Sequence, residues 1–90
     1  MKEKIERLKT SESLTNGELY DPAMLITDQE EADEYLSALV DRYMRQRGVS
    51  KEEAEGVQRA NIGYYSGYMS DETAIRAKKL FRCKHPVFDG

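Results

Sequence analysis

Cysteine and long apolar runs are scarce in this sequence of 90 residues. The one cysteine, Cys83, cannot form a disulfide within the chain, which is typical of a reducing compartment. The longest apolar run spans four residues, Ala23 to Ile26, far below the roughly 20 that a membrane span requires. The charged N-terminal stretch lacks the apolar segment of a secretory signal. These absences predict a cytoplasmic protein.

Histidine is equally scarce. His85 is the only one, and a single histidine supplies too few ligands for the common metal sites. A zinc site needs about four ligands at paired spacings, and Cys83 with His85 has no second pair. A di-iron bundle needs Glu-x-x-His motifs on two helices, which one histidine cannot supply. No catalytic triad or phosphate-binding glycine loop can be assembled from the remaining residues. We therefore predict a non-enzymatic protein without a cofactor or metal, and we interpret Cys83 as a packing residue.

Charge is abundant but unevenly distributed along the chain. The net charge is −3; residues 28–34 hold five acids and no base, whereas residues 76–84 hold five bases and no acid. Opposite patches of this kind can meet within one fold or between two copies. A chain with this net charge is not a typical nonspecific nucleic-acid binder, although one basic face would suffice for weak binding.

The clearest helix prediction covers residues 28–47. Thr27 and Glu30 have the spacing of a capping box, in which a hydroxyl and a carboxylate satisfy the first backbone amides. Gly48 ends the helix, because glycine readily adopts the left-handed conformation of a helix C-terminus. Apolar side chains recur at steps of three and four and form one stripe: Ala32, Tyr35, Leu36, Leu39, Val40 and Tyr43.

Two further helices are predicted over residues 51–66 and 71–83. Ser50 with Glu53 gives the first a capping box, and Ser70 caps the second. Short connections around Gly48 and around Gly67 to Ser70 require neighbouring helices to turn back sharply. We therefore expect an all-α fold with three main helices, arranged as a small bundle or an orthogonal array.

Residues 1–26 are predicted to be an N-terminal arm and strap, and residues 27–90 the helical domain. Residues 1–9 form either a short helix or a frayed arm. Asn16-Gly17 favours a turn and Asp21-Pro22 breaks a helix, so residues 18–26 are expected to be extended across the core. At the other end, His85-Pro86 predicts a turn that docks Val87 and Phe88 on the bundle.

The stretch NIGYYSGYM, residues 61–69, is the most distinctive in the chain. Gly63 and Gly67 share a helix face where another backbone can approach closely. The tyrosines carry large rings whose hydroxyls need a partner or water: Tyr64, Tyr65 and Tyr68. The pattern fits a tight helix crossing within the fold, an aromatic surface for a protein partner, or stacking on nucleotide bases.

A cationic run follows within the third helix: Arg76, Lys78, Lys79, Arg82 and Lys84. Helical spacing places Lys78 and Arg82 on one side, with Lys79 adjacent. The run fits a solvated surface, a phosphate-contacting face or an interface with an acidic partner. A helix-turn-helix over residues 50–81 would open its second helix with acids, where a recognition helix meets the DNA.

Residues 27–88 resemble a group of small bacterial proteins, some of them from prophages and mobile elements. The resemblance rests on EEAEGVQRANIGYYSGYMSDET and on the terminal KKLFRCKHPVF. It implies a bacterial or phage cytoplasm and a role in contacting another macromolecule. It implies no catalytic residue.

The leading hypothesis is a small protein–protein interaction module that acts as an accessory or regulatory factor, with a homodimer as one form of the interaction. Its aromatic contacts would come from Tyr64, Tyr65 and Tyr68, and its cationic rim from Arg76, Lys79 and Arg82. The alternative is a DNA- or RNA-binding regulator that uses residues 76–84. Neither hypothesis involves a membrane or a small-molecule substrate.

Overall fold

The computed structural model describes residues 1–83, which contain five helices and no β-strand. The helices are α1 (Lys2–Thr10), α2 (Asn16–Met24), α3 (Gln29–Arg47), α4 (Lys51–Gly67) and α5 (Asp71–Phe81). The all-α prediction is therefore confirmed, and residues 1–9 belong to a helix rather than a frayed arm. Over the same residues, none of the helices has both the length and the apolar character to cross a bilayer.

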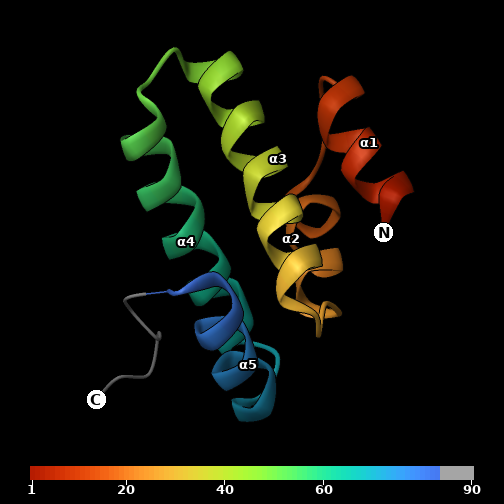
Figure 1. Cartoon of the computed structure of the whole chain (residues 1–90), viewed down its shortest axis with the longest axis vertical. Coiled ribbons are helices and arrows are strands. Elements are labelled where there is room, and N and C mark those ends of the chain that lie inside the picture. Colours follow the sequence, from red (N-terminus) through yellow and green to blue (C-terminus); the bar gives the residue numbers. More distant parts are fainter. Residues whose placement is uncertain (84–90) are drawn as a thin grey trace.

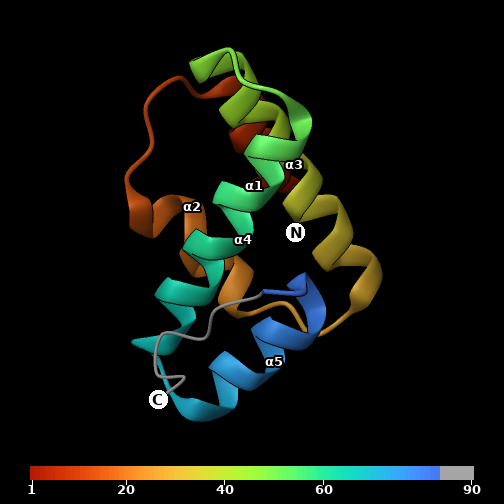
Figure 2. The same ribbon diagram turned by 90° about the vertical axis from the view of Figure 1, so that its left-hand side faces the viewer.

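Helices α3 and α4 form the centre of the molecule. They lie side by side, joined by a short turn at Gly48, and α1 packs on the other side of α3 (Figure 1). After α4 the chain turns back, so that α5 packs against α4 and α3. Helix α2 contacts α3, α4 and α5, and α4 crosses the front of the molecule in Figure 2. This arrangement leaves one side of α4 turned away from the other helices.

A single hydrophobic core joins all five helices. The largest fully buried apolar side chains come from α1, α3, α4, α5 and the turn after α2: Leu8, Ile26, Tyr35, Leu39, Ile62 and Phe81. Helix α2 adds Tyr20, Ala23 and Met24. The predicted boundary between residues 26 and 27 falls in the turn between α2 and α3, and side chains from both sides of it share this core.

The local signals for α3, α4 and α5 place their N-termini to within one residue. Ser50 and Ser70 cap α4 and α5 as predicted, accepting hydrogen bonds from the amides of Glu53 and Thr73. The cap of α3 is Asp28 rather than Thr27, because the Asp28 carboxylate accepts from the Glu31 amide at 3.0 Å.

Two predicted helix ends differ from the structure, whereas the predicted end at Gly48 is confirmed by its positive φ of 66°. Helix α4 ends at Gly67 rather than at residue 66, and the reversal predicted around Gly67 to Ser70 follows, although Gly67 has no positive φ. The amides of Tyr68 and Met69 close that turn, each bonding a carbonyl three residues back. Helix α5 ends at Phe81, before the predicted residue 83, since Arg82 adopts a left-handed conformation with φ 52°.

The extended strap predicted for residues 18–26 is wrong, because residues 16–24 form α2. Thr15 and Glu18 make a complete capping box, in which each side chain bonds the other residue's backbone amide. Pro22 lies within this helix near its end, where only one backbone hydrogen bond is lost. The gain from the cap and from burying Tyr20, Ala23 and Met24 outweighs that loss.

Side chains of α3 bind the C-terminal carbonyls of α1. Arg42, only 4% exposed, donates to the carbonyls of Leu8, Ser11 and Glu12. Arg45 donates to the Leu8 and Lys9 carbonyls, both at 3.3 Å. The last carbonyls of a helix lack partners within it and carry a partial negative charge, so guanidinium groups suit them well. These contacts attach α1 firmly to α3.

Helices α2 and α5 end in the same way, with a donor from another helix. Arg76 of α5 donates to the Met24 carbonyl at the end of α2. At the end of α5, the Phe81 carbonyl accepts from Arg59 of α4 at 3.2 Å, and the Leu80 carbonyl from Gln29 of α3 at 2.8 Å. Three of the five helices are thus capped by side chains distant in sequence.

Candidate interaction surface

The two sides of α4 differ sharply in burial. Toward the core the helix buries five residues: Ala54, Gln58, Ile62, Gly63 and Ser66. Away from the core lies a set of exposed residues, which we call the outward face of α4: Gly56, Ala60, Tyr64 and Tyr68. None of these four residues carries a charge, although 34% of the residues in the chain are charged. Nearer the start of the helix, however, Glu52 and Glu53 are exposed.

Tyr64 and Tyr68 form a pair on the outward face. Their rings are 5.1 Å apart and tilted by 59°, and a hydrogen bond of 2.8 Å joins their hydroxyls. Tyr64 is 53% exposed and Tyr68 is 71% exposed. The hydrogen bond to Tyr64 raises the pKa of Tyr68, so the Tyr68 phenol stays neutral at physiological pH. The pair offers two large rings already held in a fixed arrangement, which lowers the entropy lost on binding.

Gly56 has no evident role within the fold. It lies inside α4 without a positive φ, and a Cβ atom built there would have no neighbour within 4 Å. Glycine in a helix interior is about 1 kcal/mol less favourable than alanine. Neither backbone conformation nor internal packing accounts for a glycine here, and the outward face consequently has an open position two turns before Tyr64.

Tyr65 belongs to the fold rather than to the outward face. Its hydroxyl donates to the Asp21 carboxylate, and its ring lies 5.8 Å from that of Tyr20. The bond to Asp21 raises the pKa of Tyr65. The structure thus divides the three predicted tyrosines, leaving two on the outward face and using one in the α2–α4 contact.

The three predicted cations are divided as well. Arg76 is half-buried against the end of α2, whereas Lys79 and Arg82 are exposed. Arg82 lines a depression between α3 and α4 together with Glu55. Glu55 and Tyr64 are nine positions apart, and at about 100° per residue this puts them on opposite sides of α4. Arg82 therefore does not form a rim around the exposed tyrosine pair.

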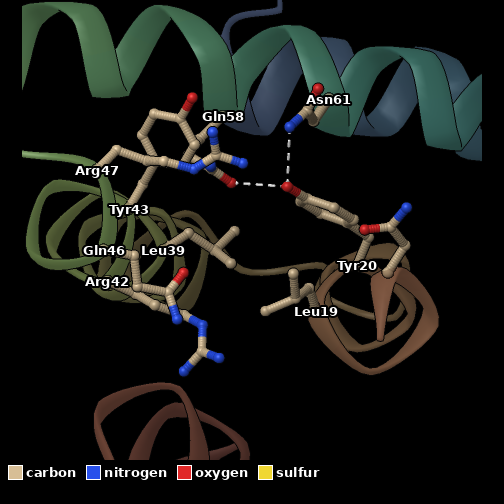
Figure 3. A pocket seen from close by; sticks show the side chains of 10 residues that line it. Leu19, Tyr20, Leu39, Arg42, Tyr43, Gln46, Arg47, Gln58 and Asn61 are labelled. Atoms are coloured by element: carbon tan, nitrogen blue, oxygen red, sulfur yellow. Dashed lines mark hydrogen bonds between the residues drawn. The ribbon is translucent and has the colours of Figure 1, made fainter. Parts of the chain in front are cut away.

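A small polar cavity lies between α2, α3 and α4 (Figure 3). Its volume is about 180 Å³, below the roughly 300–1,000 Å³ of typical small-molecule sites. The Tyr20 hydroxyl donates to Gln58 at 2.9 Å and accepts from Asn61 at 3.0 Å, and Arg42 points away from the cavity toward α1. These side chains bond one another or the backbone, so we interpret the cavity as part of the packing between α2 and α4.

Cys83 is buried, in agreement with a packing role. Burial raises the pKa of its thiol to about 11, while Arg59 and the Gly63 backbone act in the opposite direction. Gly63 itself is buried on the core side of α4. His85, Val87 and Phe88, with the predicted turn, lie outside the described residues; within residues 1–83 no group of three or more metal-binding side chains gathers.

Sequence reasoning missed two features of this region. Asn61 and Gln58 were not recognised as partners of Tyr20, since these residues are about 40 positions apart in the chain. Gly56 was overlooked in favour of Gly63 and Gly67. A signal was present, however, because residues 60–70 contain no charged side chain and Gly56 lies just before them.

Comparison of the chain with protein-family models gives no match. Neither the curated proteins nor the solved structures searched include one that matches it significantly. The function of this chain must therefore be inferred from the geometry of its own surface.

Proposed function

We propose that this chain is a non-enzymatic protein-binding module that uses the outward face of α4. The observation that carries the proposal is the exposed Tyr64–Tyr68 pair, which lies within residues 60–70, a stretch with no charged side chain. Tyrosine is enriched at the centres of protein interfaces, where charged residues are depleted. An accessory or regulatory role in a bacterial or phage setting would suit a chain of this size.

The test is a double substitution, Tyr64→Ala with Tyr68→Ala, in the full chain. We expect its circular dichroism and thermal unfolding to match the parent chain, because both side chains are largely exposed. We also expect loss of self-association in sedimentation, or of a protein that co-purifies with the parent chain. Tyr65→Phe serves as the matched control, since it alters a tyrosine of the same helix that faces α2.

The nucleic-acid alternative would use the exposed cations of α5: Lys78, Lys79 and Arg82. It is less well supported, because Asp71 and Glu72 are exposed at the start of the same helix and Arg76 is committed to α2. Binding of this kind weakens steeply as salt rises. A gel-shift series with duplex DNA and RNA at low salt tests it, and no retardation at micromolar protein would rule it out.

A further inference from the structure

We infer that the cavity between α2, α3 and α4 binds a small oxyanion, such as inorganic phosphate or a short carboxylate. The buried amide of Gln58 donates hydrogen bonds to the anion, and Arg47 at the edge of the cavity supplies positive charge. The site does not depend on the proposed function, because neither Tyr64 nor Tyr68 lines the cavity.

A chain of hydrogen bonds crosses from α4 to α2 and back, and it ends in unused donors. The Tyr20 hydroxyl accepts from the Asn61 amide at 3.0 Å and donates to the Gln58 amide oxygen at 2.9 Å (Figure 3). The amide nitrogen of Gln58 carries two further N–H groups. Neither of them donates to another group within residues 1–83.

The free donor end of Gln58 opens into the cavity. Gln58 lines this cavity and is only 4% exposed. Within the part of the chain that the structure describes, no fully buried side-chain nitrogen or oxygen lacks a partner. The unpartnered amide nitrogen must therefore lie at the small accessible part of Gln58. A donor with so little access to solvent gains from an acceptor held within the cavity.

The charges that line the cavity have one sign. Arg42 and Arg47 are among its lining residues, and no aspartate or glutamate is. Arg42 is 4% exposed, and its guanidinium, which points toward α1, bonds only neutral carbonyls. No carboxylate of residues 1–83 forms an ion pair with it. A buried charge without a counter-charge is unfavourable, so a nearby anion is favoured over a neutral acceptor.

Arg47 is the lining cation whose N–H groups remain available. It is exposed, and its guanidinium lies 5.5 Å from the centre of the Tyr43 ring, which also lines the cavity. Stacking on the ring restrains the guanidinium without using its N–H groups, and no carboxylate of the described chain pairs with them. Asn16, the first residue of α2, adds the partial positive charge of a helix N-terminus at the same cavity.

The acidic residues closest along the chain have other partners or lie outside the cavity. Glu18 bonds Arg7 at 2.7 Å, and Asp21 accepts from the Tyr65 hydroxyl. Glu12 is exposed and contributes its backbone carbonyl, not its carboxylate, to the contacts with α3. None of these acids takes the position of the proposed anion.

The size of the cavity limits the ligand. Its volume is about 180 Å³, several times the roughly 30 Å³ that a water molecule occupies in the liquid. A small oxyanion with part of its water fits this space, whereas a nucleotide requires a larger site. Four of the lining residues are exposed and give the anion access from solvent: Asn16, Gln46, Arg47 and Asn61.

Titration of the full chain with potassium phosphate tests the site, with chloride keeping the ionic strength constant. We expect the side-chain amide signals of Gln58 to shift in two-dimensional NMR and to saturate with a Kd below about 10 mM. A parallel titration with sodium acetate distinguishes a tetrahedral oxyanion from a carboxylate as the ligand. The absence of a saturable shift with either anion up to about 50 mM overturns the inference.

Matched variants locate the binding. Arg47→Ala should weaken it at least about fivefold, because the available guanidinium is lost. Lys79→Ala removes an exposed positive charge of α5 that does not line the cavity, so the Kd should change less than about twofold. Equal weakening by the two variants would mean that the anion associates with surface charge in general, and the inference is then wrong.

Gln58→Glu tests the buried donor. The carboxylate can still accept from the Tyr20 hydroxyl, but it replaces the N–H groups with a negative charge, so binding should be lost. Circular dichroism shows whether the helices of this variant remain. Saturable binding by a folded Gln58→Glu chain contradicts the inference, and if the variant does not fold, the comparison of Arg47→Ala with Lys79→Ala decides.

Discussion

Ile62 and Tyr64 lie two positions apart on α4 in opposite environments. Ile62 is fully buried, and the neighbouring polar residues on its side, Gln58 and Ser66, have partners within the chain. Tyr64 is more than half exposed, and its hydroxyl bonds only its neighbour Tyr68 among the described contacts. The comparison shows that one side of α4 packs into the core, whereas the other is exposed and adds little to the fold.

Loss of the buried polar contacts between α3 and the end of α1 should have the largest effect on the free energy of unfolding. Arg42→Ala removes a buried guanidinium that donates to three backbone carbonyls, and it leaves the Ser11 carbonyl without that donor. We expect a loss of about 3 kcal/mol or more in the free energy of unfolding, measured in urea. Arg47→Ala is the control, because Arg47 is exposed and lies over the Tyr43 ring, so the loss should stay below about 1 kcal/mol. Similar losses for the two variants would contradict the anchoring role of Arg42.

A buried tyrosine should contrast with the exposed pair. The Tyr35 hydroxyl donates to the Leu19 carbonyl at 2.6 Å and joins α3 to α2. Tyr35→Phe should therefore lower the free energy of unfolding by about 1–2 kcal/mol. Tyr64→Phe, which removes an exposed hydroxyl, should change it by less than about 0.5 kcal/mol. Equal losses in chemical denaturation would contradict the contrast between a buried and an exposed tyrosine.

Alanine substitutions at two glycines should change the free energy of unfolding in opposite directions. A Cβ atom at either Gly56 or Gly48 meets nothing within 4 Å, but Gly48 has a φ of 66° and Gly56 does not have a positive φ. Gly56→Ala should raise the monomer's free energy of unfolding by about 0.5–1 kcal/mol, and Gly48→Ala should lower it by about 1 kcal/mol. Thermal unfolding at low protein concentration measures both, and a loss at Gly56 would mean that the fold itself requires that glycine.

The smallest expected effect is on the reactivity of Cys83, which is buried after the end of α5. Because the folded pKa is raised to about 11, the thiol stays protonated at neutral pH. Alkylation by iodoacetamide at pH 8 should be much slower in the native chain than in urea. Unfolding exposes a thiol with a lower pKa, so this group's contribution to stability is present below about pH 8.5 and declines as pH rises toward 11. Rapid native labelling would show that Cys83 is exposed.

Much of the fold could be predicted from local sequence. Apolar spacing and capping residues located α3, α4 and α5, because these signals act within one or two turns of a helix. Helix α2 was missed although Thr15 and Glu18 carry a capping signal, since Pro22 and Asn16-Gly17 were given more weight than the burial that offsets them.

The candidate site was predictable only in part. The tyrosine cluster identified the right helix end, but spacing alone could not separate Tyr65 from Tyr64 and Tyr68. Their roles depend on Asp21 and Tyr20, which come from α2. Spacing alone could not show the role of Arg76 either. It donates to the Met24 carbonyl, 52 positions away in the chain, and so does not contribute to an exposed cationic rim.

By itself, the sequence determined that the chain forms helices, where most of them begin, and that residues 60–70 carry no charge. The tertiary structure alone decided which side of α4 faces outward and which arginines serve as caps for other helices. The physical reason is the range of the interactions. Caps and apolar periodicity act between near neighbours, whereas burial and long-range hydrogen bonds depend on segments that folding brings together.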